Sequence, residues 1–450
     1  MTIQEAFNIA NQKYRAGRIA EAREICRNIV AVDPGQAEAW HLLGLTLYQG
    51  GDPAGAVEPI GRAVALMPGR MDFYYNHALV FDSIQRREES GAALLLAARS
   101  RATDADLLTQ VGRALYFTGH PTEAIDCAKR LLEMRPDDAF SHWNYAILLL
   151  LHGRLAEGFR EFEWRHSMGE YVPERRQPSP AWNGEPMPDG TLLVCSEGGL
   201  GDVLLFVRYV PMLVGKVGKV VLECQPSLFP LVENLAGVEQ VIARGEFAPP
   251  VEGHVYLSSL PRVFGTDLAT VPNQVPYLKV PARGVEKWAG RVICDGLLNV
   301  GLCWSGNREA SPGDKRSVTL TQLAPLAGIP GVRYYSLQLG KDAGQTRPAG
   351  LEMVDFTADI HDFGDTAALV AQLDSVISVD TSVAHLAGAL GKPVWVLVQF
   401  VPAYQWLLDR TDSPWYPTAR IFRQTSLDDW PAAIAAVAEA LKEKARTQAG

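Results

Sequence analysis

The chain lacks paired cysteines, long apolar runs and a net positive charge. Its six cysteines are scattered and contain no Cys-x-x-Cys pair, which argues against a disulfide framework and a zinc site. No apolar run approaches the roughly 20 residues needed to cross a bilayer, and the first residues have no apolar signal core. The formal net charge of −9 argues against general nucleic-acid binding. We therefore expect a cytoplasmic protein with reduced thiols, no membrane span and no nucleic-acid partner.

The composition is typical of soluble globular domains, with 47% hydrophobic and 21% charged residues. The 450 residues exceed one ordinary domain and are enough for two or three with full cores. The sequence patterns divide them into a repetitive first third and a remainder of a different kind.

The first third repeats with a fixed period. Pro34, Pro68 and Pro136 are separated by 34 and then by 68 residues, which is twice 34. Small and large residues keep the same frame, namely Trp40, Leu43, Gly44, Ala56, Ile60 and Ala63 in one unit and Leu108, Val111, Gly112, Ala124, Ala128 and Leu131 in another. Small residues let two helices approach, large ones fill the gap, and proline ends the second helix. Residues 1–168 therefore resemble an α-solenoid of tetratricopeptide repeats.

Such arrays present a concave groove that can hold an extended peptide. We expect the repeats to bind a protein partner in this way. The alternative, in which the array is a packing spacer without a ligand, stays open at this point.

The rest of the chain has a different pattern. Residues 169–190 are rich in proline and indicate a linker. Beyond them, strand-like runs such as "TLLVC", "NVGLCW" and "SVISVD" alternate with helical patterns, which indicates parallel, doubly wound α/β structure. We predict two Rossmann-like domains, residues 191–290 and 291–427, and a C-terminal helix over 428–450. Facing domains of this kind bind ligands at the carboxyl ends of their strands.

One candidate loop follows the run "SVISVD". A helix that begins at Thr381 and Ser382 would offer free N–H groups and the positive end of its dipole to a phosphate. Asp380 ends the strand, and His385 lies on the same helical face as Thr381. It is equally open that Asp380 or Thr381 only caps the helix and that His385 is an ordinary half-buried imidazole.

A second candidate loop follows the run "NVGLCW". Its first residues would let a ligand approach the backbone and are candidates for substrate binding: Trp304, Ser305, Gly306 and Asn307. Further along, Lys315 and Arg316 could hold a diphosphate, although a charge run of this kind can also be a solvated surface loop.

Two more stretches carry candidate residues. In "SLQLGKD", Gln338 and Lys341 follow another strand and could hydrogen-bond to phosphate oxygens. In "SEGGLGD", Gly199 and Gly201 permit a tight turn and close approach to the backbone, but the pattern is not the Gly-x-Gly-x-x-Gly dinucleotide fingerprint. Asp202 is either the cap of a helix or a carboxylate that takes a proton from an acceptor hydroxyl.

Residues 180–445 as a whole resemble a GT-B glycosyltransferase of the heptosyltransferase-like type. The resemblance is carried by "GLGDVLLFVRY", "VGLCWSGN", "DKRSVTL", "DFGDTAALVAQLDSVISVDTSVAHLAGALGKPVWVLV" and "SPWYPTARIFRQ". It implies that Asp202 is the general base and that Lys315 lies beside the donor phosphates. It also implies that Asp380, Thr381 and His385 bind the donor diphosphate.

Joined to the repeats, this half is also similar to the protein O-GlcNAc transferase architecture. That similarity implies that Gln338, Lys341, Thr381 and Ser382 hold the nucleotide diphosphate. One segment departs from bacterial proteins of this arrangement, which often carry Asp-Trp-Arg-Trp where this chain has Ala403, Tyr404, Gln405 and Trp406. Loss of the acid and of the arginine would change the choice of donor or weaken activity.

The resemblance implies transfer of a sugar from a nucleotide-sugar donor to an acceptor hydroxyl, with inversion at the anomeric carbon. We expect no cofactor and no metal, because a helix dipole and lysines could replace a divalent ion. The repeats suit a protein or peptide acceptor. The alternative is a non-catalytic scaffold, in which the repeats recruit a partner and a degenerate GT-B half binds a nucleotide without transferring anything.

Overall fold

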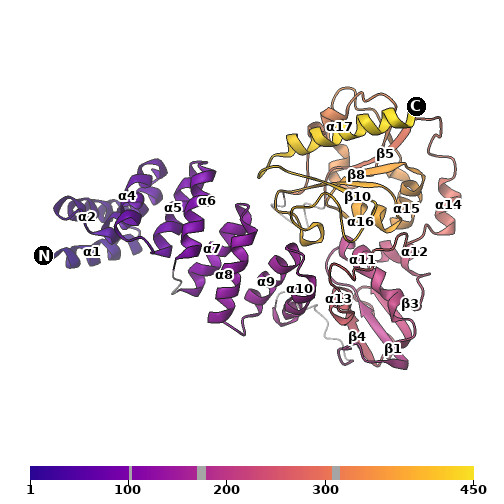
Figure 1. Ribbon diagram of the computed structural model, residues 1–450, viewed down its shortest axis with the longest axis horizontal. Coiled ribbons are helices and arrows are strands. Elements are labelled where there is room, and N and C mark those ends of the chain that lie inside the picture. Colours follow the sequence, from indigo (N-terminus) through magenta and orange to yellow (C-terminus); the bar gives the residue numbers. More distant parts are fainter. Residues whose placement is uncertain (101–103, 170–178, 307–314, 450) are drawn as a thin grey trace. The chain divides into compact units, whose positions relative to one another are not determined.

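The computed structural model describes residues 1–100, 104–169, 179–306 and 315–449. The chain divides into two compact units, Met1–Leu148 and Leu149–Gly450. Figure 1 colours the first unit indigo to purple and the second purple to yellow. None of the helices in the described ranges is long and apolar enough to cross a membrane.

The first unit consists of helices that pack in sequential pairs (Figure 1). The helices are α1 (Ile3–Arg15), α2 (Ile19–Val32), α3 (Ala37–Gln49), α4 (Pro53–Leu66), α5 (Met71–Ser83), α6 (Arg87–Arg99), α7 (Ala105–Phe117), α8 (Pro121–Met134) and α9 (Ala139–Leu151), whose last residues belong to the second unit. This is the helix-turn-helix solenoid that the 34-residue period predicts.

The residues of the repeat pattern explain the packing of these pairs. A Cβ atom on Gly44 of α3 would lie 2.3 Å from Cγ1 of Ile60 in α4, so only glycine lets the two helices approach as they do. Pro53 is the first residue of α4, where its missing N–H has no helical partner to lose. The Asp52 side chain accepts a hydrogen bond from the backbone N–H of Gly55 and caps the same helix.

The second unit begins before the predicted end of the repeats at residue 168. Its first elements are α10 (Leu155–Glu161) and the 3₁₀ helix η1 (Phe162–Ser167). The Phe159 ring of α10 packs edge-on at 6.2 Å from the Phe206 ring, and Arg165 of η1 is fully buried with its guanidinium 2.6 Å from Glu197. Aromatic packing and a buried ion pair therefore join residues 155–168 to the α/β part.

The first sheet of this unit is parallel and has the order β3-β2-β1-β4. Its strands are β1 (Met187–Cys195), β2 (Val217–Cys224), β3 (Val238–Ala243) and β4 (Gly253–Tyr256), with helices α11 (Leu200–Phe206), α12 (Phe229–Val232) and α13 (Leu260–Val263). β1 starts inside the segment predicted as a linker, of which residues 170–178 lie outside the described residues.

The second sheet is also parallel and has the order β10-β9-β8-β5-β6-β7. Its strands are β5 (Leu298–Cys303), β6 (Val332–Ser336), β7 (Met353–Asp355), β8 (Ser375–Val379), β9 (Val394–Val398) and β10 (Ala419–Arg423). Helices α15 (Phe363–Gln372), α16 (Ser382–Ala389) and α17 (Trp430–Ala449) accompany it. Residues of α17 share one buried core with β5, β8 and β9, so the predicted C-terminal helix is part of this layer.

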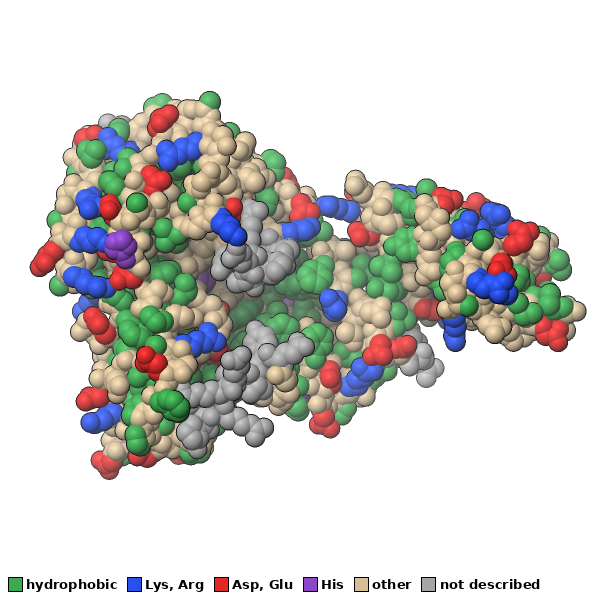
Figure 2. All heavy atoms as spheres, turned by 180° about the vertical axis from the view of Figure 1, so that it is seen from behind, with side chains coloured by type: hydrophobic (Ala, Val, Ile, Leu, Met, Phe, Trp, Pro, Cys, Tyr) green, Lys and Arg blue, Asp and Glu red, His purple; other side chains and the backbone are tan. Residues whose placement is uncertain are grey.

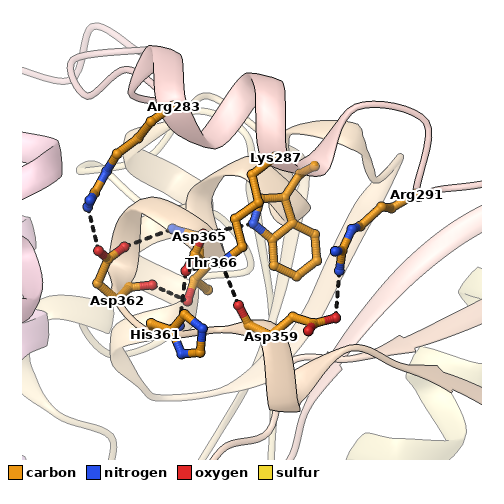
Figure 3. A network of polar contacts seen from close by, with 9 residues as sticks. Arg283, Lys287, Arg291, Asp359, His361, Asp362, Asp365 and Thr366 are labelled. Atoms are coloured by element: carbon orange, nitrogen blue, oxygen red, sulfur yellow. Dashed lines mark hydrogen bonds and ion pairs between the residues drawn. The ribbon is translucent and has the colours of Figure 1, made fainter.

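Helix α14 (Ala282–Trp288) was predicted to belong to the first Rossmann-like domain, but it packs on α15 of the second. Figure 3 shows the polar contacts that hold it there. The Asp365 carboxylate accepts hydrogen bonds from Lys287 Nζ at 2.8 Å and from the Trp288 indole at 2.9 Å, and Arg291 pairs with Asp359 at 2.6 Å. The domain of the second sheet therefore begins at α14, before its first strand β5.

Both sheets have one point at which the direction of strand order reverses. In the first sheet it lies between β1 and β4, and in the second between β5 and β8. The second order is the 3-2-1-4-5-6 arrangement of doubly wound sheets, in which ligands bind at the carboxyl ends of the strands beside the reversal. The loops after β1, β5 and β8 are therefore the ones in which to look for a site.

Candidate functional site

The loops after β1 and β8 come together because α11 packs against α16 (Figure 1). Figure 2 shows a hollow between the two lobes of the α/β unit, with hydrophobic side chains and histidine visible on its floor. The candidate site lies where α11, the N-terminal end of α16 and the loop after β5 meet.

The N-terminal end of α16 begins at Ser382, directly after the carboxyl end of β8. Thr381 is its N-cap residue, but its side chain makes no capping hydrogen bond. The Thr381 hydroxyl instead lies 3.0 Å from Ser378 Oγ, turned back toward the strand. The first N–H groups of a helix have no partner within it, so Ser382 and Val383 can offer theirs to an anion. Thr381 itself therefore contributes the position of its backbone and not a hydroxyl directed away from the strand.

Asp380 and His385 are both buried beside this helix end. Burial raises the pKa of the Asp380 carboxyl. Burial also lowers the pKa of His385 to about 3, and the positive charges of Arg208 and Arg316 act in the same direction. His385 is therefore neutral at physiological pH. Its ring stacks on Trp406 with 5.2 Å between centroids, and its Nε2 lies 3.8 Å from Asp380 Oδ1.

The loop after β5 is held in place by the amide of Gln338. Its Oε1 accepts hydrogen bonds from the backbone N–H groups of Trp304 and Ser305, at 3.0 and 2.8 Å. Its Nε2 donates to the carbonyls of Ser305 and Leu339, each at 3.1 Å. Gln338 therefore shapes the loop and has no amide hydrogen to spare for a phosphate, in contrast to its predicted role.

One further residue of this region, Trp304, lies differently from the prediction. The Trp304 side chain is buried in the core of the second sheet and does not face a ligand. Lys341 is exposed at the start of the 3₁₀ helix η6 (Lys341–Gly344). Asn307 lies outside the described residues. Ser305 and Gly306 do reach the site, where the Gly306 N–H donates to Ser317 Oγ at 3.0 Å and the Ser305 hydroxyl donates to Asp342.

The two predicted cations of this loop have different positions. Lys315 is exposed, and its ammonium pairs with Asp428 at 3.1 Å. Arg316 lies next to Gly306. A Cβ atom placed on Gly306 would be 3.5 Å from Arg316 Nε and 3.8 Å from Thr381 Cγ2. The charge of Arg316 lowers the pKa values of Asp202, Asp380 and His385. Of these two residues, Arg316 is therefore the one that lies at the site.

The glycine-rich loop after β1 presents Asp202 to α16. Gly198 has a φ of +70°, a conformation that favours glycine. Gly199 is the N-cap residue of α11, and its N–H donates to Asp202 Oδ2 at 2.8 Å, so Asp202 caps the helix from its third position and not as the N-cap residue. A Cβ atom on Gly201 would lie 2.9 Å from Cδ2 of His385, which shows how closely α11 approaches α16. The two readings of Asp202 are compatible, because the capping carboxylate also faces the second domain.

The Asp202 carboxyl is half-buried and has a raised pKa of about 6. Burial is the main cause, since it removes water from the carboxylate, and the negative charges of Asp380 and Glu197 add to it. The Gly199 hydrogen bond and the charge of Arg316 act against the rise. A carboxylate with a pKa near 6 is a suitable proton acceptor at neutral pH.

Residues 403–406 contribute directly to the site. In this segment we expected the missing acid and arginine to change the choice of donor or weaken activity. Gln405 Nε2 lies 3.4 Å from Asp202 Oδ1, and Trp406 stacks on His385. From the sequence alone, these residues are only a departure from related proteins. Two further residues of the site were not predicted, namely Asp342 and Ser317, which contact Ser305 and Gly306. Their place beside Lys341 and Arg316 in the chain is the only signal that could have pointed to them.

Comparisons with known proteins agree with the first unit. A tetratricopeptide-repeat family model matches residues 7–72 and 111–163. The N-terminal part of the chain thus carries tetratricopeptide repeats, as predicted. Protein FlbA of Caulobacter vibrioides is 26% identical over 474 residues, which cover 98% of this chain and 73% of that protein.

Solved structures are similar to part of the chain. The crystal structure of MamA has a TM-score of 0.30 at 20% identity and covers 36% of this chain and 95% of its own. The crystal structure of YrrB, described as a tetratricopeptide-repeat protein with an unusual peptide-binding site, has a TM-score of 0.31 at 16% identity and covers 37% and 85%.

The contact between Gly201 and His385 gives a first prediction. Gly201→Leu places a side chain against the buried imidazole and is expected to destabilise the second unit by about 3 kcal/mol, as overpacked sites do. The matched control is Gly199→Leu in the same loop. Gly199 is exposed, and its Cβ atom would meet only the Asp202 carboxylate at 3.6 Å, so a cost below about 1 kcal/mol is expected. Urea denaturation measures both, and equal losses would contradict the close packing of α11 on α16.

Proposed function

We propose that the second unit is a glycosyltransferase with a GT-B fold, similar to the heptosyltransferase-like type. It would transfer a sugar from a nucleotide-sugar donor to a hydroxyl of a protein bound by the repeats. The observation that carries the proposal is the position of the Asp202 carboxylate, which reaches from the first sheet to the N-terminal end of α16 in the second. A proton acceptor and an anion-binding helix end thus face the same gap.

Several features support binding of the donor diphosphate at α16. The N–H groups of Ser382 and Val383 and the positive end of the helix dipole attract an anion. Arg316 adds a full positive charge beside Gly306 and Thr381. Gly306 has no side chain, so phosphate oxygens can approach the backbone of the loop after β5. These groups are fixed before the donor binds, by the Gln338 hydrogen bonds among others.

The proposed reaction is a single displacement. The acceptor hydroxyl gives its proton to the Asp202 carboxylate while its oxygen bonds to the anomeric carbon of the sugar. The bond from that carbon to the diphosphate oxygen breaks, and its electron pair leaves with the nucleoside diphosphate. Attack from the face opposite the leaving group inverts the configuration. Arg316 and the α16 N–H groups stabilise the charge that grows on the leaving group, which lowers the barrier more than they stabilise the bound substrate.

Donor binding distinguishes the two neighbouring cations. Arg316→Ala removes the charge that faces α16 and is expected to weaken binding of nucleoside diphosphates about tenfold or more. Lys315→Ala is the matched control, because Lys315 is exposed and paired with Asp428, and it should change the affinity less than about threefold. Titration calorimetry with UDP, GDP and ADP measures both. An equal loss in the two variants, or a larger one for Lys315→Ala, would contradict the assignment of Arg316.

The pKa of Asp202 predicts the pH dependence of transfer. With a pKa of about 6, the proton-accepting form is lost as the pH falls, so kcat/KM should drop about tenfold per pH unit below 6 and level off above it. Gln405→Arg places a cation beside the carboxylate, lowers its pKa and shifts this limb to lower pH. Asp202→Asn should reduce transfer by about 100-fold to 10,000-fold.

Stability measurements show whether the loss of transfer activity in Asp202→Asn comes from misfolding. Because the folded pKa of Asp202 lies above its ordinary value of 3.8, its contribution to stability is present at low pH and is lost as the pH rises through about 6. The neutral asparagine avoids that loss, so Asp202→Asn should be at least as stable as the parent at pH 7.5.

Binding of nucleoside diphosphates without turnover of any nucleotide sugar in a broad panel would instead favour the non-catalytic scaffold.

The first unit offers a place for a protein acceptor. A cavity of about 350 Å³ lies among α7, α8 and α9. Its lining is mostly apolar and includes Leu108, Tyr116, Leu131, Trp143, Asn144 and Ile147. Phe117 at this cavity is 67% exposed, which is unusual for a large hydrophobic side chain and is typical of an interaction site. We therefore place the acceptor's recognition segment in this cavity.

Filling the cavity tests this placement. Asn144→Trp puts an indole into it and should reduce incorporation of labelled sugar into protein about tenfold, while hydrolysis of the donor in the absence of acceptor stays unchanged. Gln110→Trp adds the same side chain at an exposed position of α7 that does not line the cavity, and it should have no effect. Unimpaired incorporation by Asn144→Trp would show that the acceptor binds elsewhere.

A further inference from the structure

The side chains behind His385 form a chain of hydrogen bonds that the proposed reaction does not use. His385 Nδ1 lies 2.9 Å from the Tyr416 hydroxyl. The Tyr416 oxygen lies 3.5 Å from the Tyr277 oxygen, and Arg208 donates to Tyr277 at 2.9 Å. These residues come from four separate segments, so their alignment on one imidazole nitrogen is specific to the folded second unit.

The hydrogens of this chain can be assigned one by one. A carbonyl oxygen only accepts, and the Tyr277 oxygen lies 2.7 Å from the Leu204 carbonyl oxygen, so the Tyr277 hydrogen is donated there. Arginine only donates, so Arg208 gives a hydrogen to the Tyr277 oxygen. The hydrogen of Tyr416 is left to choose between Tyr277 at 3.5 Å and His385 Nδ1 at 2.9 Å. The shorter distance is close to the ideal for a hydrogen bond and the longer one is at the limit.

The surrounding charges favour the same assignment. Tyr416 is fully buried, and burial keeps the pKa of its hydroxyl well above the ordinary value, so it stays a neutral donor. The Arg208 guanidinium lies 4.7 Å from the centre of the Tyr416 ring, on the Nδ1 side of the imidazole. A lone pair on Nδ1 is more favourable beside this charge than an N–H group. On the opposite side, Nε2 faces Asp380, where an N–H group is favoured.

We propose that Tyr416 is a positioning residue that holds neutral His385 in the tautomer protonated at Nε2. Asp380 alone does not decide the tautomer, because 3.8 Å is too long for a hydrogen bond. The Nε2–H group then points toward Asp380 and the start of α11, at the helix end where the proposed function places the diphosphate. Its use there rests on that proposed function, whereas the tautomer itself does not.

The consequence is a neutral hydrogen-bond donor beside the N–H groups of α16. A neutral imidazole can donate from one nitrogen only, so the wrong tautomer would turn a lone pair toward phosphate oxygens and repel them. Tyr416 thus contributes to anion binding without touching the ligand. Its ring is fixed for this purpose by Gly388, where a Cβ atom would lie 2.4 Å from the ring.

The tautomer can be measured directly on the full-length protein without any ligand. Long-range proton–nitrogen NMR spectra of protein labelled with ¹⁵N-histidine distinguish a protonated ring nitrogen from a bare one, and His385→Gln assigns the signals. We expect a bare Nδ1 and a protonated Nε2 at neutral pH. Tyr416→Phe keeps the ring but removes the hydrogen bond, so the signals should move toward a mixture of tautomers or to Nδ1–H. Tyr209→Phe removes another buried hydroxyl, bonded to Thr266 at 2.9 Å, and should leave the spectrum of His385 unchanged.

A protonated Nδ1 in the unsubstituted protein would overturn the proposal, whether or not Tyr416→Phe folds. An unchanged tautomer in folded Tyr416→Phe would overturn it as well. Titration with UDP, GDP and ADP adds the link to binding, for which Tyr416→Phe should weaken the affinity about threefold to tenfold. If the tautomer behaves as expected but no nucleoside diphosphate binds the unsubstituted protein, the proposed function fails and the role of Tyr416 toward His385 stands.

Discussion

The close approach of α11 to α16 is the constraint on which the rest of the candidate site depends. It places the loop at the strand-order reversal of the first sheet beside the loop at the reversal of the second. Asp202 and His385 therefore lie close together, although they are 183 positions apart in the chain. The approach is possible because Gly201 has no side chain where the imidazole edge lies. It also explains the electrostatics, because the same contact excludes water from Asp202, Asp380 and His385 and shifts the pKa of each toward its neutral form.

Much of the architecture could be predicted from local patterns in the sequence. The 34-residue period fixes pairs of helices because it records which residues touch within one repeat, as Gly44 and Ile60 do. The alternation of apolar runs and helical patterns predicts parallel sheets, and the carboxyl ends of their strands indicate the loops that matter. The domain boundaries were predicted less well. Arg165 and Lys287 each lie in a segment whose composition matches its neighbours in sequence, whereas their partners Glu197 and Asp365 lie on another element.

The candidate site could be predicted only as far as the loops that carry it. A polar residue after a strand can turn toward a ligand or toward the backbone, and its type does not decide between the two. Gln338 has the chemistry of a phosphate ligand, but its amide makes hydrogen bonds to the backbone of Trp304 and Ser305. Lys315 and Arg316 are adjacent in the chain, yet one pairs with Asp428 and the other faces Thr381. Contacts such as Gln405 with Asp202 and Tyr416 with His385 join distant segments, and no periodicity reports them.

The charges of the site bear on whether its acidic residues are compatible with the anionic donor of the proposed function. Asp202, Asp380 and Glu197 would together repel a diphosphate if all three were exposed carboxylates. Glu197 is instead neutralised by Arg165, whose paired charge lowers the pKa of the carboxyl despite burial. Burial raises the pKa of Asp380, and the positive charge of Arg316 acts on both Asp380 and Asp202. Under the proposed function, the negative charge of a bound donor raises the pKa of Asp202 further. Asp202 therefore becomes a stronger proton acceptor at the moment when the acceptor hydroxyl needs one, and the helix end and the carboxylate act as one coupled device although they belong to different sheets.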